Sequence, residues 1–282
     1  MNIIIKDSLS FGAYFLTIVC TVSSLSGFSM LDLCPFSEMS FIKATFFRLL
    51  LIIAFYLLIV LITGVVLFFV FCKREIKMMI NGMSVTIKRG DIFKEDAMRV
   101  IPVDTCFQTT VDDTIIAKNT LHGQLVLQHG NVDNIKNAVR MKAKREGIKK
   151  GTDGNYPFKT GTAIRYDGTD GRYIMVALIK LDANNEAHTN TAQFEITLIN
   201  IWKAINRVYA QNPVALPVFG SGIARFDDAH YSTEQLVVFM LLMLKKSKAQ
   251  IKSKITIILH SKDEVETILS LREHKRFFEL LR

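Results

Sequence analysis

The sequence predicts an α/β layer domain preceded by a hairpin of two membrane-spanning helices. Two long uncharged stretches lie near the start of the chain, and nearly all Lys, Arg, Asp and Glu residues follow residue 72. From about Gly82, short β-branched runs alternate with segments of helical periodicity, which is the pattern of an α/β layer fold. The chain therefore divides into a hairpin over residues 1–77 and a soluble domain over residues 78–282.

The uncharged stretches cover residues 8–31 and 49–72. Each is long enough to cross a bilayer core of about 30 Å, whereas helices in a soluble core rarely stay uncharged for so long. A pair of buried helices in a large soluble core is the alternative. A cleavable signal peptide is not predicted, because a basic start, a shorter apolar stretch and a small-residue cleavage site are not evident together.

The charges beside these stretches predict their orientation. The basic run at residues 73–77 follows the second stretch directly, and positive charge next to a span holds that side in the cytoplasm. Both termini are then expected on the cytoplasmic side of a bacterial inner membrane. Small residues from Ala13 to Gly27 recur at steps of three and four, which places them on one helical face. This face predicts a helix–helix contact, within the hairpin or between protomers, and the alternative is that the two spans simply pack on each other as a passive anchor.

Short β-branched runs predict the strands of the soluble domain, and the last two are apolar throughout, as in strands buried on both faces. The expected strands cover residues 84–88, 99–103, 163–166, 172–181, 214–218 and 255–260.

Three helices are expected in the second half of this domain. From Phe194 to Tyr209 an apolar residue returns every three or four positions, and Trp202 belongs to this core-facing stripe. Residues 235–244 are apolar all round but too short to cross a membrane, so they predict a helix that covers the sheet. A charged amphipathic helix at residues 263–281 closes the chain.

The distribution of basic residues, cysteines and histidines argues against a nucleic-acid partner, a disulfide and a metal site. The densest basic cluster lies at residues 136–150, partly on a helix that Asn131 or Asp133 could cap. It could rest on anionic lipid, although such clusters are more often solvated faces. Nucleic acid is not predicted as a partner, because no aromatic residues are interleaved for stacking. The four cysteines and six histidines lack paired or metal-ligand spacing, so neither a disulfide nor a metal site is expected.

A glycine-serine-glycine loop follows the expected strand at residues 214–218. Two glycines around a serine let backbone N–H groups converge on an oxyanion without interference from Cβ atoms. Phosphate is the ligand expected at such a loop. A tight turn without a ligand is the alternative. The candidate ligand-binding residues of this segment are Gly220, Ser221, Gly222, Ile223, Ala224, Arg225 and Phe226.

A second candidate segment, Arg89-Gly90-Asp91-Ile92-Phe93, follows the first expected strand of the domain. A carboxylate at a strand end can accept a hydrogen bond from an exocyclic amine, such as that of adenine. The Asp91 carboxylate could equally cap the next helical turn.

Together, Gly-Asp-Ile after an early strand and Pro-Val-Phe-Gly-Ser-Gly-Ile after a late one resemble the macro domain family. The resemblance implies a three-layer α/β/α domain with a mixed sheet that binds ADP-ribose or a derivative, without any cofactor. It implies that Asp91 contacts adenine, with Ile92 beside the ring, and that the loop at residues 220–224 holds the diphosphate.

The chain departs from the macro pattern where that family usually has Asn-Ala-Ala-Asn. Asp104-Thr105-Cys106-Phe107 stands there, so the asparagine associated with de-ADP-ribosylation is missing and a sensor is expected rather than an enzyme. A hydrolase with Asp104 as its base is the alternative. Asp104 could accept ribose hydroxyls, while His122 could touch the group attached to that ribose or remain a surface loop residue. The candidate residues here are Asp104, Thr105, Phe107, His122 and Gly123.

The whole layout, two spans, a basic junction and a variant macro domain, resembles the membrane effectors of type II Thoeris antiphage systems. That resemblance implies a TIR-domain partner that makes an ADP-ribose-derived signal, the histidine conjugate of ADP-ribose. It also implies that the bound signal drives homo-oligomerisation and disruption of the lipid bilayer, which amounts to abortive infection. A passive anchored scaffold that binds another protein is a further alternative.

Overall fold

The computed structural model divides into two compact units, Met1–Lys73 and Arg74–Arg282. In the first unit, residues 53–65 form a helix inside the second predicted span. No helix in the described part of the chain is both long and apolar enough to cross a membrane. The predicted spans lie mostly outside the described residues, so the hairpin stays a prediction. The structure describes residues 13–14, 46, 50, 53–65, 75–182, 186–222, 225–260 and 271.

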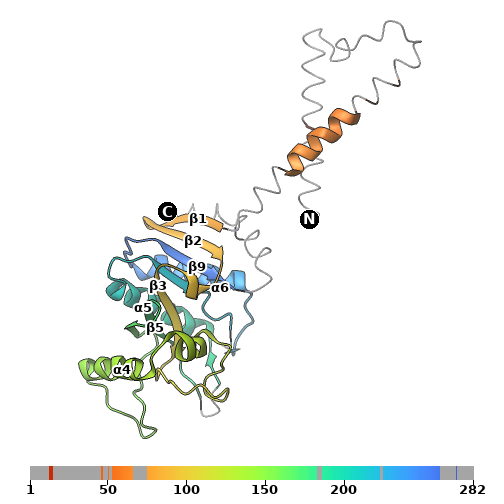
Figure 1. Cartoon of the computed structure of the whole chain (residues 1–282). Coiled ribbons are helices and arrows are strands. Elements are labelled where there is room, and N and C mark those ends of the chain that lie inside the picture. Colours follow the sequence, from red (N-terminus) through yellow and green to blue (C-terminus); the bar gives the residue numbers. More distant parts are fainter. Residues whose placement is uncertain are drawn as a thin grey trace. The chain divides into compact units, whose positions relative to one another are not determined.

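A mixed seven-stranded sheet forms the centre of the second unit (Figure 1). Its strand order is β1-β2-β9-β7-β3-β5-β4. The inner strands are parallel, whereas the edge strands β1 and β4 run antiparallel to their neighbours. The strands are β1 (Glu75–Ile80), β2 (Met83–Arg89), β3 (Met98–Asp104), β4 (Ala163–Asp167), β5 (Arg172–Ile179), β7 (Val214–Pro217) and β9 (Ile255–Leu259).

Two hydrophobic clusters lie on opposite faces of this sheet, because alternate residues of one strand point to opposite sides. Val100 of β3 belongs to the cluster that also holds residues of α5 (Thr191–Val208) and α6 (Thr233–Ser247). Its neighbour Ile101 belongs to the cluster that includes residues of α4 (Val132–Glu146). The predicted three-layer α/β/α architecture with a mixed sheet is therefore confirmed.

Shorter elements connect these layers. They are the 3₁₀ helix η2 (Ile92–Lys94), α3 (Leu121–Gln124), the π-helical turn η3 (Leu125–His129) and a two-stranded parallel sheet of β6 (His188–Thr189) and β8 (Arg225–Phe226).

Strand β1 was not among the predicted strands, and the predicted domain boundary between residues 77 and 78 falls inside it. Ile76, Met78 and Ile80 are buried, while Lys77 and Met79 between them are exposed. This alternation is typical of an edge strand with one solvated face. Lys77 on that outer face belongs to the basic run that predicts a membrane junction, which is why the sequence does not indicate a strand here.

The predicted core helices are confirmed. Trp202 of α5 is completely buried, and its indole Nε1 donates a 3.0 Å hydrogen bond to the Met240 carbonyl oxygen of α6. Asn131 caps α4 by accepting a hydrogen bond from the Asn134 amide, one of the two predicted possibilities. Of the closing helix predicted at residues 263–281, only Leu271 is described, and it is helical and buried.

Candidate functional site

Three candidate segments follow the carboxyl ends of the parallel strands β2, β7 and β3. Asp91 follows β2, the glycine loop follows β7, and Asp104 ends β3. Parallel strands bring these ends to one edge of the sheet, which is where ligands bind in open α/β sheets. The topology therefore gathers all three segments at one edge.

Gly220 is required by the backbone of the loop after β7. Its φ is +86°, in the region that favours glycine. A Cβ atom built there would lie 3.2 Å from Phe194 Cζ, 3.3 Å from Leu236 Cδ2 and 3.4 Å from Phe226 Cζ. The loop is thus packed tightly against α5, α6 and β8.

Gly222 differs from Gly220, since no described atom lies within 4 Å of a Cβ built at this position. The Ser221 hydroxyl is used inside the turn, where it donates a 2.9 Å hydrogen bond to the Val218 carbonyl oxygen. The loop therefore has a packed side at Gly220 and an open side at Gly222. The candidates Ile223 and Ala224 lie outside the described residues.

Asp91 acts as a helix cap in this structure. Its Oδ1 accepts a 3.0 Å hydrogen bond from the Phe93 amide and so caps η2. Its Oδ2 lies 3.8 Å from Lys94 Nζ, and the side chain remains 43% exposed. The capping alternative is confirmed, and a carboxylate with several lone pairs can still accept from a ligand. Ile92 is buried in the core cluster on the α4 face.

Asp104 holds its own loop together. Its Oδ1 accepts a 2.6 Å hydrogen bond from the Cys106 amide, and its Oδ2 accepts a 3.0 Å bond from the Gln108 amide. Phe107, at a φ of +52°, is buried and packs edge-on against Phe158, with ring centroids 5.2 Å apart. Both oxygens of this buried carboxylate therefore accept a backbone hydrogen bond, and each keeps a further lone pair.

His122 lies beside Asp104, with Nδ1 4.0 Å from Oδ2 and only 11% of its side chain exposed. Burial lowers the pKa of His122, and the Asp104 charge acts in the opposite direction. The interpretation of His122 as a surface loop residue is thus wrong. The structure also places Thr105 at this site, buried, and Gly123, whose built Cβ would come within 2.4 Å of the Ala117 carbonyl oxygen.

The sequence matches the family model described as "Thoeris protein ThsA, Macro domain" over residues 85–260. The chain belongs to this family. The curated Thoeris protein ThsA of Bacillus amyloliquefaciens (strain Y2) is 29% identical over 274 residues, which cover 92% of this chain and 87% of that protein. Both resemblances predicted from the sequence, to the macro domain and to Thoeris effectors, are confirmed at the level of the family.

Solved structures of an Oceanobacillus iheyensis macrodomain are similar to this member of the ThsA macro domain family. A variant with ADPR and a form with ADP are each 14% identical to this chain, with a TM-score of 0.48 and 71% of this chain covered. The match covers 97% and 95% of those two macrodomain chains, respectively.

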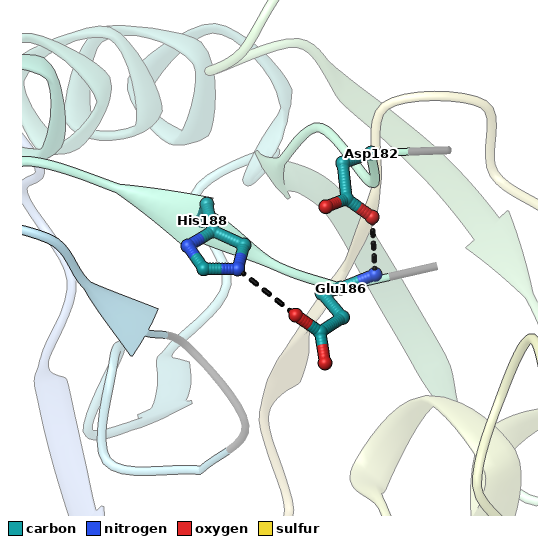
Figure 2. A group of neighbouring side chains, drawn as sticks. All are labelled: Asp182, Glu186 and His188. Atoms are coloured by element: carbon teal, nitrogen blue, oxygen red, sulfur yellow. Dashed lines mark hydrogen bonds and ion pairs between the residues drawn. The ribbon is translucent and has the colours of Figure 1, made fainter. Parts of the chain in front are cut away.

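One polar cluster was missed from the sequence. His188 of β6 lies between two carboxylates, with Nδ1 2.7 Å from Asp227 Oδ1 and Nε2 3.1 Å from Glu186 Oε2. Arg225 NH1 lies 2.6 Å from Glu186 Oε1. Asp182 accepts a 2.8 Å hydrogen bond from the Glu186 amide (Figure 2). The side chains of Glu186, His188, Arg225 and Asp227 pair across β6 and β8, so they form an ion-pair network. Glu186 and His188 are close in the sequence, but Asp227 lies 39 residues after His188, so the three form no recognisable motif.

Gln108 was also missed. Its Oε1 is buried and has no hydrogen-bond partner in the part of the chain that the structure describes. A buried acceptor without a donor lowers the stability of the fold. Gln108 is therefore a further candidate residue of the site beside Asp104. The only sequence signal was its place shortly after the end of a strand.

Proposed function

We propose that the chain is a membrane-anchored antiphage effector whose macro domain binds an ADP-ribose-derived signal made by a TIR-domain partner. The observation that carries this proposal is the glycine loop at the carboxyl edge of the sheet, packed at Gly220 and open at Gly222. Backbone amides on such a loop can approach a diphosphate closely. Membership of the ThsA macro domain family supports the same ligand class.

The surroundings of Asp104 favour a sensor over a hydrolase. A general base needs a lone pair aimed at the proton that it removes. Backbone hydrogen bonds from the Cys106 and Gln108 amides fix the Asp104 carboxylate for its own loop, so it is not free to turn toward an attacking water, while its remaining lone pairs can accept ribose hydroxyls. In the proposed function, Asp104 binds the distal ribose and His122 contacts the group attached to it. The nucleotide is released unchanged.

Signal binding is coupled to the membrane by a change in assembly. A ligand shifts a two-state protein only through its different affinity for the two states, and a full switch needs about 5.5 kcal/mol. A nucleotide enclosed by the segments around Asp91, Asp104 and Gly220 offers contacts for such a difference. The predicted spans at residues 8–31 and 49–72 would then associate and disrupt the inner membrane.

Vesicle leakage tests this function. The full chain is reconstituted in phosphatidylethanolamine–phosphatidylglycerol vesicles that contain a self-quenched dye. Histidine-ADP-ribose is expected to release the dye, whereas ATP at the same concentration is not, and the recovered nucleotide should be chemically intact. Leakage that is independent of the nucleotide, or cleavage of the conjugate, would contradict the effector role.

A further inference from the structure

The glycine loop continues into β8, and β8 is held by β6. The two strands pair in parallel, with His188 opposite Arg225 and Thr189 opposite Phe226. The Arg225 amide donates to the Ala187 carbonyl oxygen at 2.8 Å, and the Asp227 amide donates to the Thr189 carbonyl oxygen at 2.9 Å. A sheet of two such short strands is weak by itself, so its side chains decide whether it stays formed.

The contacts of His188 require a particular protonation state. A neutral imidazole has one N–H donor and one bare nitrogen, whereas the imidazolium donates from both nitrogens. In this structure each ring nitrogen lies within 3.1 Å of a carboxylate oxygen, one of Asp227 and one of Glu186. Only the protonated ring can satisfy both contacts, since a bare nitrogen would face a negative oxygen.

The charges around His188 make its proton important for the cluster. The carboxylates are those of Asp182, Glu186 and Asp227, with Asp228 nearby accepting from the Thr191 amide at 3.1 and 3.0 Å. Arg225 also pairs with this group, through Glu186 Oε1. Without the proton, one of the two carboxylates, Asp227 or Glu186, faces a bare ring nitrogen and loses its hydrogen bond from His188, and like charges accumulate beside β8.

Phe226 connects β8 to the glycine loop. Its ring packs edge-on against Phe194, with centroids 5.0 Å apart. Phe226 Cζ and Phe194 Cζ are two of the atoms that close the space over Gly220, at 3.4 and 3.2 Å from a Cβ built there. A shift of β8 would therefore change the packed side of the loop.

We propose that protonated His188 is a positioning residue that clasps β8 to β6 and holds the glycine loop in its diphosphate-binding conformation. This inference rests on the proposed function and adds a dependence on pH. The hydrogen bonds that the ring donates to Asp227, and then to Glu186, raise the pKa of His188 above its ordinary value. The clasp is therefore complete below about pH 6.5 and is lost as the pH rises through the raised pKa of the folded state.

Four other groups with shifted pKa values titrate outside this pH window. The pKa values of Glu186 and Asp228 are lowered, so both carboxylates stay ionised. Burial lowers the pKa of His122 and raises the pKa of the Cys106 thiol, which moves both titrations away from the window between pH 6.5 and about 8.5.

Calorimetric titration of the full-length chain in detergent with ADP-ribose, from pH 6.5 to 8.5, tests the clasp. In the unmodified protein, Kd is expected to rise about fivefold across this range, the effect of one or two exposed charge pairs. His188→Gln, which cannot titrate, should give a flat profile near the high-pH Kd. Equal slopes in both proteins would overturn the inference.

Histidine NMR supplies a second readout that a purely structural role would not give. Binding and protonation are linked reciprocally, so a fivefold coupling means that ADP-ribose raises the His188 pKa by about 0.7. The His188 signal is assigned by its absence in His188→Gln. An unshifted pKa in a protein that binds ADP-ribose would refute the clasp alone. Absence of binding of both ADP-ribose and histidine-ADP-ribose at every pH would refute the proposed function as well.

Discussion

Replacing Gly222 with Glu is expected to weaken binding of the ADP-ribose signal by more than about 100-fold while leaving the fold intact, because like charges brought together in a binding site cost several kcal/mol. A Cβ at position 222 meets no described atom within 4 Å, so the new side chain needs no rearrangement of the core. It extends into the open side of the loop, where the diphosphate is proposed to lie. Calorimetry measures the affinity, and circular dichroism checks the fold.

Two control variants separate charge from backbone effects. Gly222→Ala adds a side chain without a charge and should weaken binding far less. Asn134→Glu adds the same charge on the exposed first turn of α4, where a negative group suits the helix dipole, and should leave the affinity unchanged. An affinity of Gly222→Glu equal to that of the unmodified protein would show that this loop does not bind the diphosphate.

Trp202→Ala is expected to lower the free energy of unfolding by about 3–5 kcal/mol, the usual cost of truncating a large buried aromatic residue. The side chain is completely buried between α5 and α6, and its removal also leaves the Met240 carbonyl oxygen without its indole donor. Urea unfolding followed by circular dichroism measures this loss. Tryptophan fluorescence cannot follow unfolding here, because Trp202 is the single tryptophan of the chain and the variant removes it.

Ile196→Ala on the same helix is the matched control. Its side chain is 53% exposed, so its truncation should change stability by no more than about 0.5 kcal/mol. Trp202→Phe keeps most of the packed volume and should fall between the two. A Trp202→Ala variant no less stable than Ile196→Ala would contradict the assignment of Trp202 to the core.

The parallel strands could be predicted because burial on both faces leaves a continuous apolar run. Val214 to Leu216 and Ile257 to Leu259 show this signal, and α5 shows a clear stripe at helical spacing. The edge strand β1 gave a mixed signal, since its outward residues include Lys77. Periodicity thus predicts an element well when its burial is regular.

The site could be predicted only in part, because side-chain partners depend on the tertiary fold. The glycine loop has a local sequence signal, so its position after β7 was predicted. His188 meets Asp227 only after β6 and β8 pair, and strands of two residues have no periodicity to detect. Similarly, nothing local indicates that His122 is buried beside Asp104.

Thermal denaturation of the full-length chain with and without ADP-ribose compounds is the most direct test of nucleotide recognition by this loop. At a ligand concentration near 100 times Kd, binding adds about 2.7 kcal/mol to stability, which corresponds to a rise in Tm of roughly 5–10 °C for a domain of this size. Histidine-ADP-ribose should give this rise and ATP should not. No shift with any ADP-ribose compound, or an equal shift with ATP, would contradict the account.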